Sequence, residues 1–102
     1  MDIYFEVMSC LGRRIRISRE HWTYLVQMKH PELSERAQDV QNALMDADFV
    51  RLSRVDLEVC LYYKQIGKYY LCVVCRHFNG EGFIITSYLT DREKEGKEIW
   101  RR

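Results

Sequence analysis

The sequence lacks any long apolar run and any marked excess of charge of one sign. No stretch approaches the ~20 consecutive apolar residues of a membrane-spanning helix, and the opening residues 1–3 lack the basic start of a signal peptide. We therefore expect no membrane association and a cytoplasmic location. The chain has 16 basic and 15 acidic residues, and this net charge of +1 does not indicate a nucleic-acid partner.

The length and composition fit one ordinary globular domain spanning residues 1–102. At 102 residues the chain is too short for a two-domain enzyme or a complete (β/α)₈ barrel. At 47% apolar and 30% charged residues, disorder is not expected. The sequence contains no internal repeat and no linker.

The four cysteines favour neither disulfides nor zinc. Three of them lie in apolar runs, where cysteine behaves as a small hydrophobic residue. Cys72-x-x-Cys75-x-His77 has some likeness to a metal knuckle, but residues three apart on a strand point to opposite faces. Walker loops, dinucleotide fingerprints, HExxH and nucleophile elbows are also missing. We expect no metal and no cofactor.

The first half of the chain predicts a hairpin followed by two helices. Residues 3–8 and residues 14–17 each show the period-2 alternation of a strand, and Gly12 lies between them. They predict a hairpin whose second strand is basic. Ser18 is a suitable N-cap for a helix reaching Lys29. Pro31 ends that helix and suits the first position of a second one, whose apolar stripe runs to about Asp46.

The second half predicts four strands joined by short turns, at residues 49–53, 60–66, 69–77 and 83–88. Asn79-Gly80 is a strong signal for a tight turn. The predicted fold class is α+β, in which the N-terminal β-hairpin and two helices pack on a four-stranded antiparallel sheet.

Charge is unevenly distributed along the chain. Residues 1–19 carry net +2, residues 20–60 net −4 and residues 61–102 net +3. If the helices cover one face of the sheet, a basic groove could remain on the other. The alternative is that these charges are solvated and paired.

Cationic and hydroxyl side chains on the predicted strands form the candidate site. If the faces of the four strands coincide, one side of the sheet carries Arg51, Lys64, Arg76 and Tyr88, with Thr86 on the face of Tyr88. Such a group suits a phosphodiester, because cations stabilise the charge that develops during transfer. The alternative is that these side chains simply face water.

Histidines are the natural proton-transfer groups near neutral pH. His30, at the helix junction, could point into a cleft or only bond a nearby carbonyl. His21 lies in the first turn of its helix, where it could cap or pack. His77 borders the Asn79-Gly80 turn and is expected to be exposed.

The order of short motifs resembles the phage- and mobile-element-associated nucleases of the barnase–EndoU–colicin–RelE-like group. The resemblance covers about residues 15–100. The motifs are His21-Trp22, His30-Pro31-Glu32-Leu33, residues 49–53, Leu61-Tyr62-Tyr63-Lys64, residues 70–74, residues 80–91 and residues 96–100.

The resemblance implies a barnase/RelE-like fold and metal-independent, toxin-like RNA cleavage by attack of a 2′-hydroxyl. The partners it implies are RNA and an antitoxin or immunity protein. It carries over His30 as acid or base, Arg51, Lys64 and Arg76 as phosphate-facing cations, and Thr86 and Tyr88 as hydroxyls lining the site. Members of the group use different catalytic sets, so the base and the acid are not assigned.

Two other functions remain open. One is a catalytically inactive module of the same fold that binds nucleic acid or protein. The other is a small structural phage protein that oligomerises through its seven tyrosines. The oligomeric state is not predicted.

Overall fold

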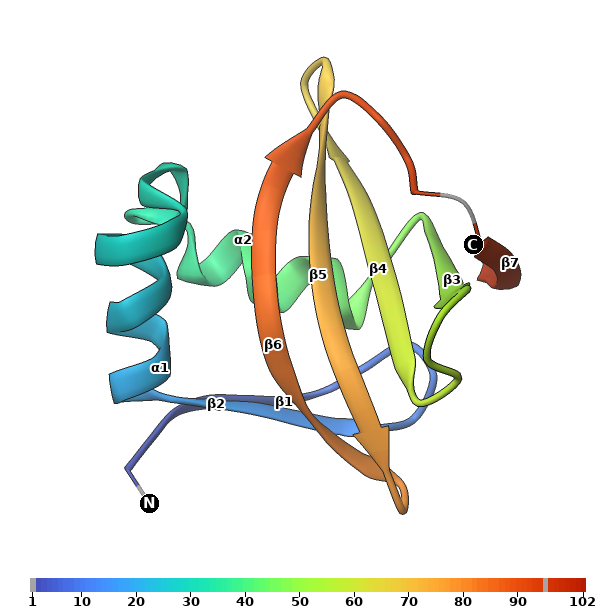
Figure 1. Ribbon diagram of the computed structural model, residues 1–102, viewed down its shortest axis with the longest axis horizontal. Coiled ribbons are helices and arrows are strands. Elements are labelled where there is room, and N and C mark those ends of the chain that lie inside the picture. The colour runs from blue at the N-terminus through green and yellow to red at the C-terminus, as the bar shows by residue number, and fades with distance from the viewer. Residues whose placement is uncertain (1, 95) are drawn as a thin grey trace.

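The fold is a strongly curved seven-stranded sheet with its helices on one side (Figure 1). The computed structural model describes residues 2–94 and 96–102. The strand order is β1-β2-β6-β5-β4-β3-β7, and only the β2–β6 pairing is parallel. The strands are β1 (Ile3–Met8), β2 (Arg14–Ser18), β3 (Phe49–Ser53), β4 (Val59–Ile66), β5 (Tyr69–Phe78), β6 (Glu81–Thr90) and β7 (Gly96–Arg101).

The helical segment contains four short elements. These are α1 (Arg19–Tyr24), a π-helical turn η1 (Leu25–Lys29), a 3₁₀ turn η2 (Pro31–Leu33) and α2 (Ala37–Met45). Ser18 caps α1 as predicted, because its Oγ accepts the backbone N–H of His21 at 3.1 Å. The predicted single helix after Pro31 is wrong. Glu35 adopts a φ of 64°, which interrupts the helix before Ala37.

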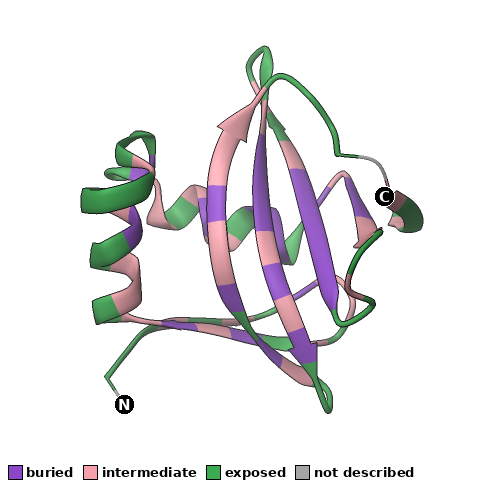
Figure 2. Ribbon diagram, viewed as in Figure 1, coloured by how far each residue is buried: buried purple, intermediate pink, exposed green. Residues whose placement is uncertain are grey.

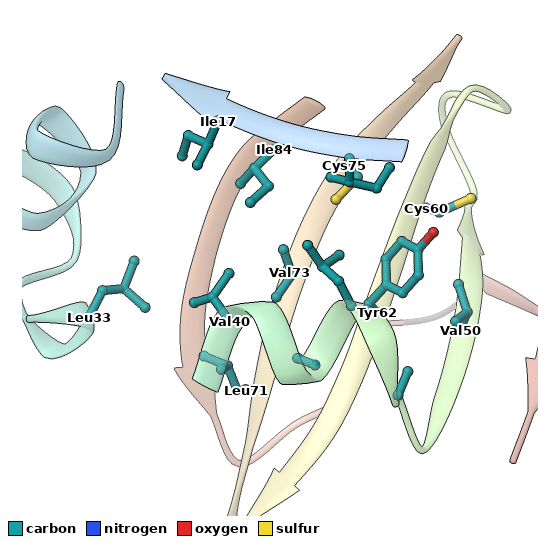
Figure 3. Close-up of a cluster of buried hydrophobic side chains, with 14 of the residues drawn as sticks. Ile17, Leu33, Val40, Val50, Cys60, Tyr62, Leu71, Val73, Cys75 and Ile84 are labelled. Atoms are coloured by element: carbon teal, nitrogen blue, oxygen red, sulfur yellow. The ribbon is translucent and has the colours of Figure 1, made fainter. Parts of the chain in front are cut away.

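The core lies between α2 and one side of the sheet, which we call the helix face. This face carries Val50, Tyr62, Val73 and Ile84, packed with Val40 and Leu44 of α2 (Figure 3). The other side, which we call the outer face, carries a smaller cluster of Phe49, Leu61, Tyr63 and Cys72. Burial is continuous over residues 59–63 of β4, whereas buried residues are interspersed with intermediate ones on β5 and β6 (Figure 2).

The predicted four-stranded antiparallel sheet with two packed helices is wrong. The described residues form a seven-stranded mixed sheet and only two short α-helices. The hairpin β1–β2 joins the sheet because residues 14–16 of β2 pair in parallel with residues 81–83 of β6. The C-terminal segment adds β7 antiparallel to β3. Neither pairing leaves a local signal, because both join segments that lie far apart in the sequence.

Candidate functional site

Four of the six predicted site residues lie on the outer face. Directly paired residues of neighbouring strands share a face, and one such row crosses the centre of the sheet. The row consists of Arg51, Leu61, Val74 and Thr86. Arg76 and Tyr88 lie two residues beyond members of this row on β5 and β6, so strand alternation places them on the same face.

Lys64 lies on the opposite side of the sheet. It pairs in register with Leu71, which is part of the core against α2. Its Nζ donates to the backbone oxygen of Asp46 at 2.9 Å and to Oδ2 of the same residue at 3.1 Å. The expectation that Lys64 shares a face with Arg51 is therefore wrong. Arg51 pairs with Leu61 of β4, and Lys64, three residues further along that strand, points to the other face.

His30 and Tyr88 meet at the edge of the outer face. Their ring centroids lie 5.7 Å apart, and His30 Nδ1 lies 3.3 Å from a carboxylate oxygen of Glu32. The Tyr88 hydroxyl is buried beside the Cys72 thiol and has no nitrogen or oxygen partner among the described residues. Burial raises the pKa of Tyr88 well above its usual value, so the hydroxyl stays protonated and can donate a hydrogen bond.

A pocket of about 300 Å³ opens beside Tyr88, and His30 is not among its lining residues. It is lined on the β6 side by Thr86 and Tyr88, and on the loop side by Arg54 and Lys94. The Lys94 ammonium lies 5.6 Å from the centre of the Tyr88 ring. We call His30, Arg54, Thr86, Tyr88 and Lys94 together the outer-face site.

The segment that carries Lys94 is fixed across the outer face. Its backbone N–H donates to the Tyr63 hydroxyl at 2.9 Å, and its carbonyl accepts from Arg51 at 3.1 Å. Burial raises the pKa of Tyr63 to about 12, so this hydroxyl is also uncharged at neutral pH. The aromatic side chain of Tyr63 thus holds the Lys94 segment in place.

Arg51 and Arg76 are already paired with carboxylates. Arg51 forms an ion pair with Glu93, and Arg76 contacts Asp56 at 2.8 Å and Glu58 at 3.2 Å. The pKa of Asp56 is lowered, first by the backbone N–H of Glu58 and then by Arg76. The charge of these two arginines is therefore largely compensated within the protein.

Sequence reasoning missed Arg54 and Lys94 as cations of the pocket. Both lie in loops, outside the strand alternation that identified the other candidates. The position of Arg54 directly after Ser53, at the end of a predicted strand, was the one available signal. For Lys94 the charged C-terminal segment contains no spacing that distinguishes it.

His21 has a structural contact at the edge of β6. Its Nε2 bonds the carbonyl oxygen of Ile85 at 2.8 Å, so this nitrogen carries the proton. That bond satisfies a backbone carbonyl of β6 beyond the residues that pair with β2.

His77 is buried, at 9% exposed, and the expectation that it is exposed is wrong. It lies on the helix face, where Nε2 contacts the Tyr62 hydroxyl at 3.0 Å and Nδ1 contacts the Cys60 sulfur at 3.5 Å. The Tyr62 hydroxyl in turn donates to Ser9 Oγ at 2.9 Å. This network belongs to the core and lies on the opposite side of the sheet from the outer-face site.

Cys72 and Cys75 face opposite sides of the sheet, as strand alternation predicts, since Cys72 belongs to the outer cluster and Cys75 to the core. Within the described part of the chain, no group of three histidine, cysteine or acidic residues is placed to hold a metal ion. In the same residues, none of the helices has the length and apolar character needed to cross a membrane.

Comparisons with protein-family models, with curated proteins and with solved structures find no match to this chain. In the outer-face site two hydroxyl-bearing residues and two cations line the pocket, and the imidazole of His30 lies against one of them, Tyr88. That combination suits an anionic ligand with hydrogen-bonding groups and a proton to transfer.

Proposed function

We propose that the chain is a metal-independent, toxin-like endoribonuclease acting at the outer-face site. The observation that carries the proposal is the His30–Tyr88 pair beside a pocket with two cations. The order of sequence motifs, which resembles the barnase–EndoU–colicin–RelE-like nucleases, supports the same function. An enzyme of this kind that acts inside a cell requires a neutralising antitoxin or immunity protein as partner.

The reaction needs a proton acceptor, a proton donor and charge stabilisation. The 2′-hydroxyl oxygen attacks the adjacent phosphorus, the bond from phosphorus to the 5′-oxygen breaks, and a 2′,3′-cyclic phosphate remains. The 2′-hydroxyl loses one proton and the departing 5′-oxygen takes one up, and we assign His30 to this proton transfer because an imidazole can both accept and donate a proton. Thr86 donates a hydrogen bond to the phosphate, and Arg54 and Lys94 stabilise its charge. Tyr88, whose hydroxyl is buried, positions the His30 ring that lies against it.

A direct test is to incubate pure protein with total RNA in EDTA. We expect cleavage products that end in cyclic phosphates, and His30→Ala should lower the rate about 10²–10⁴-fold. Gln27→Ala is the matched control, because Gln27 is exposed on the same helical segment and should leave the rate unchanged. RNA that remains intact with the wild-type protein contradicts the proposal.

The alternative function is a binding module of the same fold without catalysis. It is favoured by the ion pairs of Arg51 and Arg76, because both arginines would have to leave their carboxylates to hold a phosphate. RNA that is bound but remains intact in the same assay supports this alternative. Loss of cleavage in His30→Ala alone supports the enzyme.

A further inference from the structure

A second pocket lies where β2 and β6 diverge. The two strands pair only over residues 14–16 and 81–83, and beyond this point His21 bonds the Ile85 carbonyl instead. The gap encloses a pocket of about 390 Å³. Its apolar wall consists of Ile17, Phe83, Ile84 and Ile85, with Arg16 and His21 at its polar side.

The lining of this pocket suits a flat ring with polar edges. Phe83 is 45% exposed, so its ring is open to stacking. Arg16 supplies guanidinium donors and is held by Glu81 at 2.7 Å. Because Nε2 of His21 donates to Ile85, Nδ1 is the acceptor of the neutral ring. A nucleobase offers a stacking face together with donors and acceptors along its edge.

The pocket and the outer-face site both border β6. Ile85 and Tyr88 are three positions apart on β6, which corresponds to about 10 Å of strand. The segment from α1 to η1 lies along the same edge, with His21 bonded beside the pocket and His30 beside Tyr88. One short stretch of RNA can therefore contact both places.

We infer that the pocket between β2 and β6 is a subsite for an unstacked base of single-stranded RNA, with Phe83 as the stacking platform. This inference rests on the proposed function, because it names the part of the protein that would recognise a base of the RNA cleaved at the outer-face site. It predicts that the preferred substrate is single-stranded, since a paired base cannot enter the pocket.

The test compares two non-cleavable probes by fluorescence anisotropy. One is a short 2′-O-methyl RNA, and the other is the same chain with every base removed, so only the first can stack. We expect the wild-type protein to bind the intact probe more tightly, and Phe83→Ala to reduce that preference about tenfold. Phe83→Trp should retain it.

Phe78→Ala is the matched control. Phe78 is an exposed phenylalanine at the end of β5, 63% exposed and outside the pocket, so its removal should leave the preference unchanged. The inference is overturned if the wild-type protein binds neither probe, or if Phe83→Ala discriminates between the probes as the wild-type protein does.

The outcomes also separate this inference from the proposed function. If Phe83→Ala cleaves RNA with the base preference of the wild-type protein, the subsite inference is wrong and the proposed nuclease function is unaffected. A Phe83-dependent preference without any cleavage supports the subsite and contradicts the nuclease.

Discussion

Buried His77 should make the fold sensitive to acid. Burial lowers the pKa of its imidazole from 6.5 to about 4, and the charge of Arg13 acts in the same direction. When the pH falls, the unfolded chain therefore takes up this proton before the folded protein does. The contribution of His77 is fully present above the unfolded pKa of 6.5 and is lost as the pH falls toward about 4.

The size of the effect follows from the two pKa values. One pKa unit corresponds to about 1.4 kcal/mol, so protonation of His77 can cost the fold about 3 kcal/mol in total. Between pH 7.5 and pH 5.0 the same values give a loss of about 2 kcal/mol. This is a large part of the roughly 5–15 kcal/mol that stabilises a domain of this size.

The assay is urea unfolding followed by tryptophan fluorescence at both pH values. The lower limit of pH 5.0 is chosen because Asp56 and Glu98, whose pKa values are lowered, remain ionised there. The wild-type protein should lose about 2 kcal/mol between these values, and His77→Gln should lose much less.

An equal pH dependence in His77→Gln refutes the reasoning. If that variant does not fold, an NMR titration of His77 in the wild-type protein provides the same test. A pKa near 6.5 would then show that burial does not act on this ring as argued.

Three further substitutions test the packing of the sheet and the assignment of its faces. Gly82→Ala should destabilise the fold by about 2 kcal/mol or more, measured by the urea midpoint, because the new Cβ would lie 2.6 Å from the backbone oxygen of Arg76; an unchanged midpoint contradicts this. Lys64→Ala should leave the initial rate of RNA cleavage unchanged, because Lys64 lies on the helix face. Lys94→Ala, in the pocket of the outer face, should lower that rate about tenfold. A loss of rate in Lys64→Ala together with an unchanged rate in Lys94→Ala would contradict the assignment of the site to the outer face.

The central strands were predictable because their signals are local. Residues 49–53 form β3 with the expected bounds, and the tight turn at Asn79-Gly80 has positive φ at both residues, as such turns require. β7 was missed because Lys97, Glu98 and Arg101 obscure its alternation. Charged side chains of this kind are common on edge strands, where they prevent pairing with other molecules.

The composition of the site was more predictable than its arrangement. Residue types and strand alternation identified Arg51, Thr86 and Tyr88, and these lie on one face. Alternation within a strand does not say which of its two faces meets which face of the next strand. A difference of one residue in register reverses every side chain, and for this reason Lys64 was misplaced. His77 was expected to be exposed because it borders the Asn79-Gly80 turn, but its side of β5 faces the core.

The structure also explains how a chain of net charge +1 could serve an anionic ligand. The acidic middle of the chain compensates its basic C-terminal part directly. Asp46 pairs with Lys64 and Arg102, and the carboxylates at positions 56 and 58 pair with Arg76.

These pairs leave little uncompensated positive charge to attract a polyanion at long range. Binding at the outer-face site must then depend on a hydrogen bond from Thr86 and on stacking at Phe83, with Lys94 acting locally. Because the salt dependence of binding scales with the number of phosphates that cations neutralise, only a shallow dependence follows from this arrangement. A steep dependence would require Arg51 and Arg76 to exchange their carboxylates for phosphates, and the structure would then have to rearrange both the β3–β4 loop and the segment that holds Glu93.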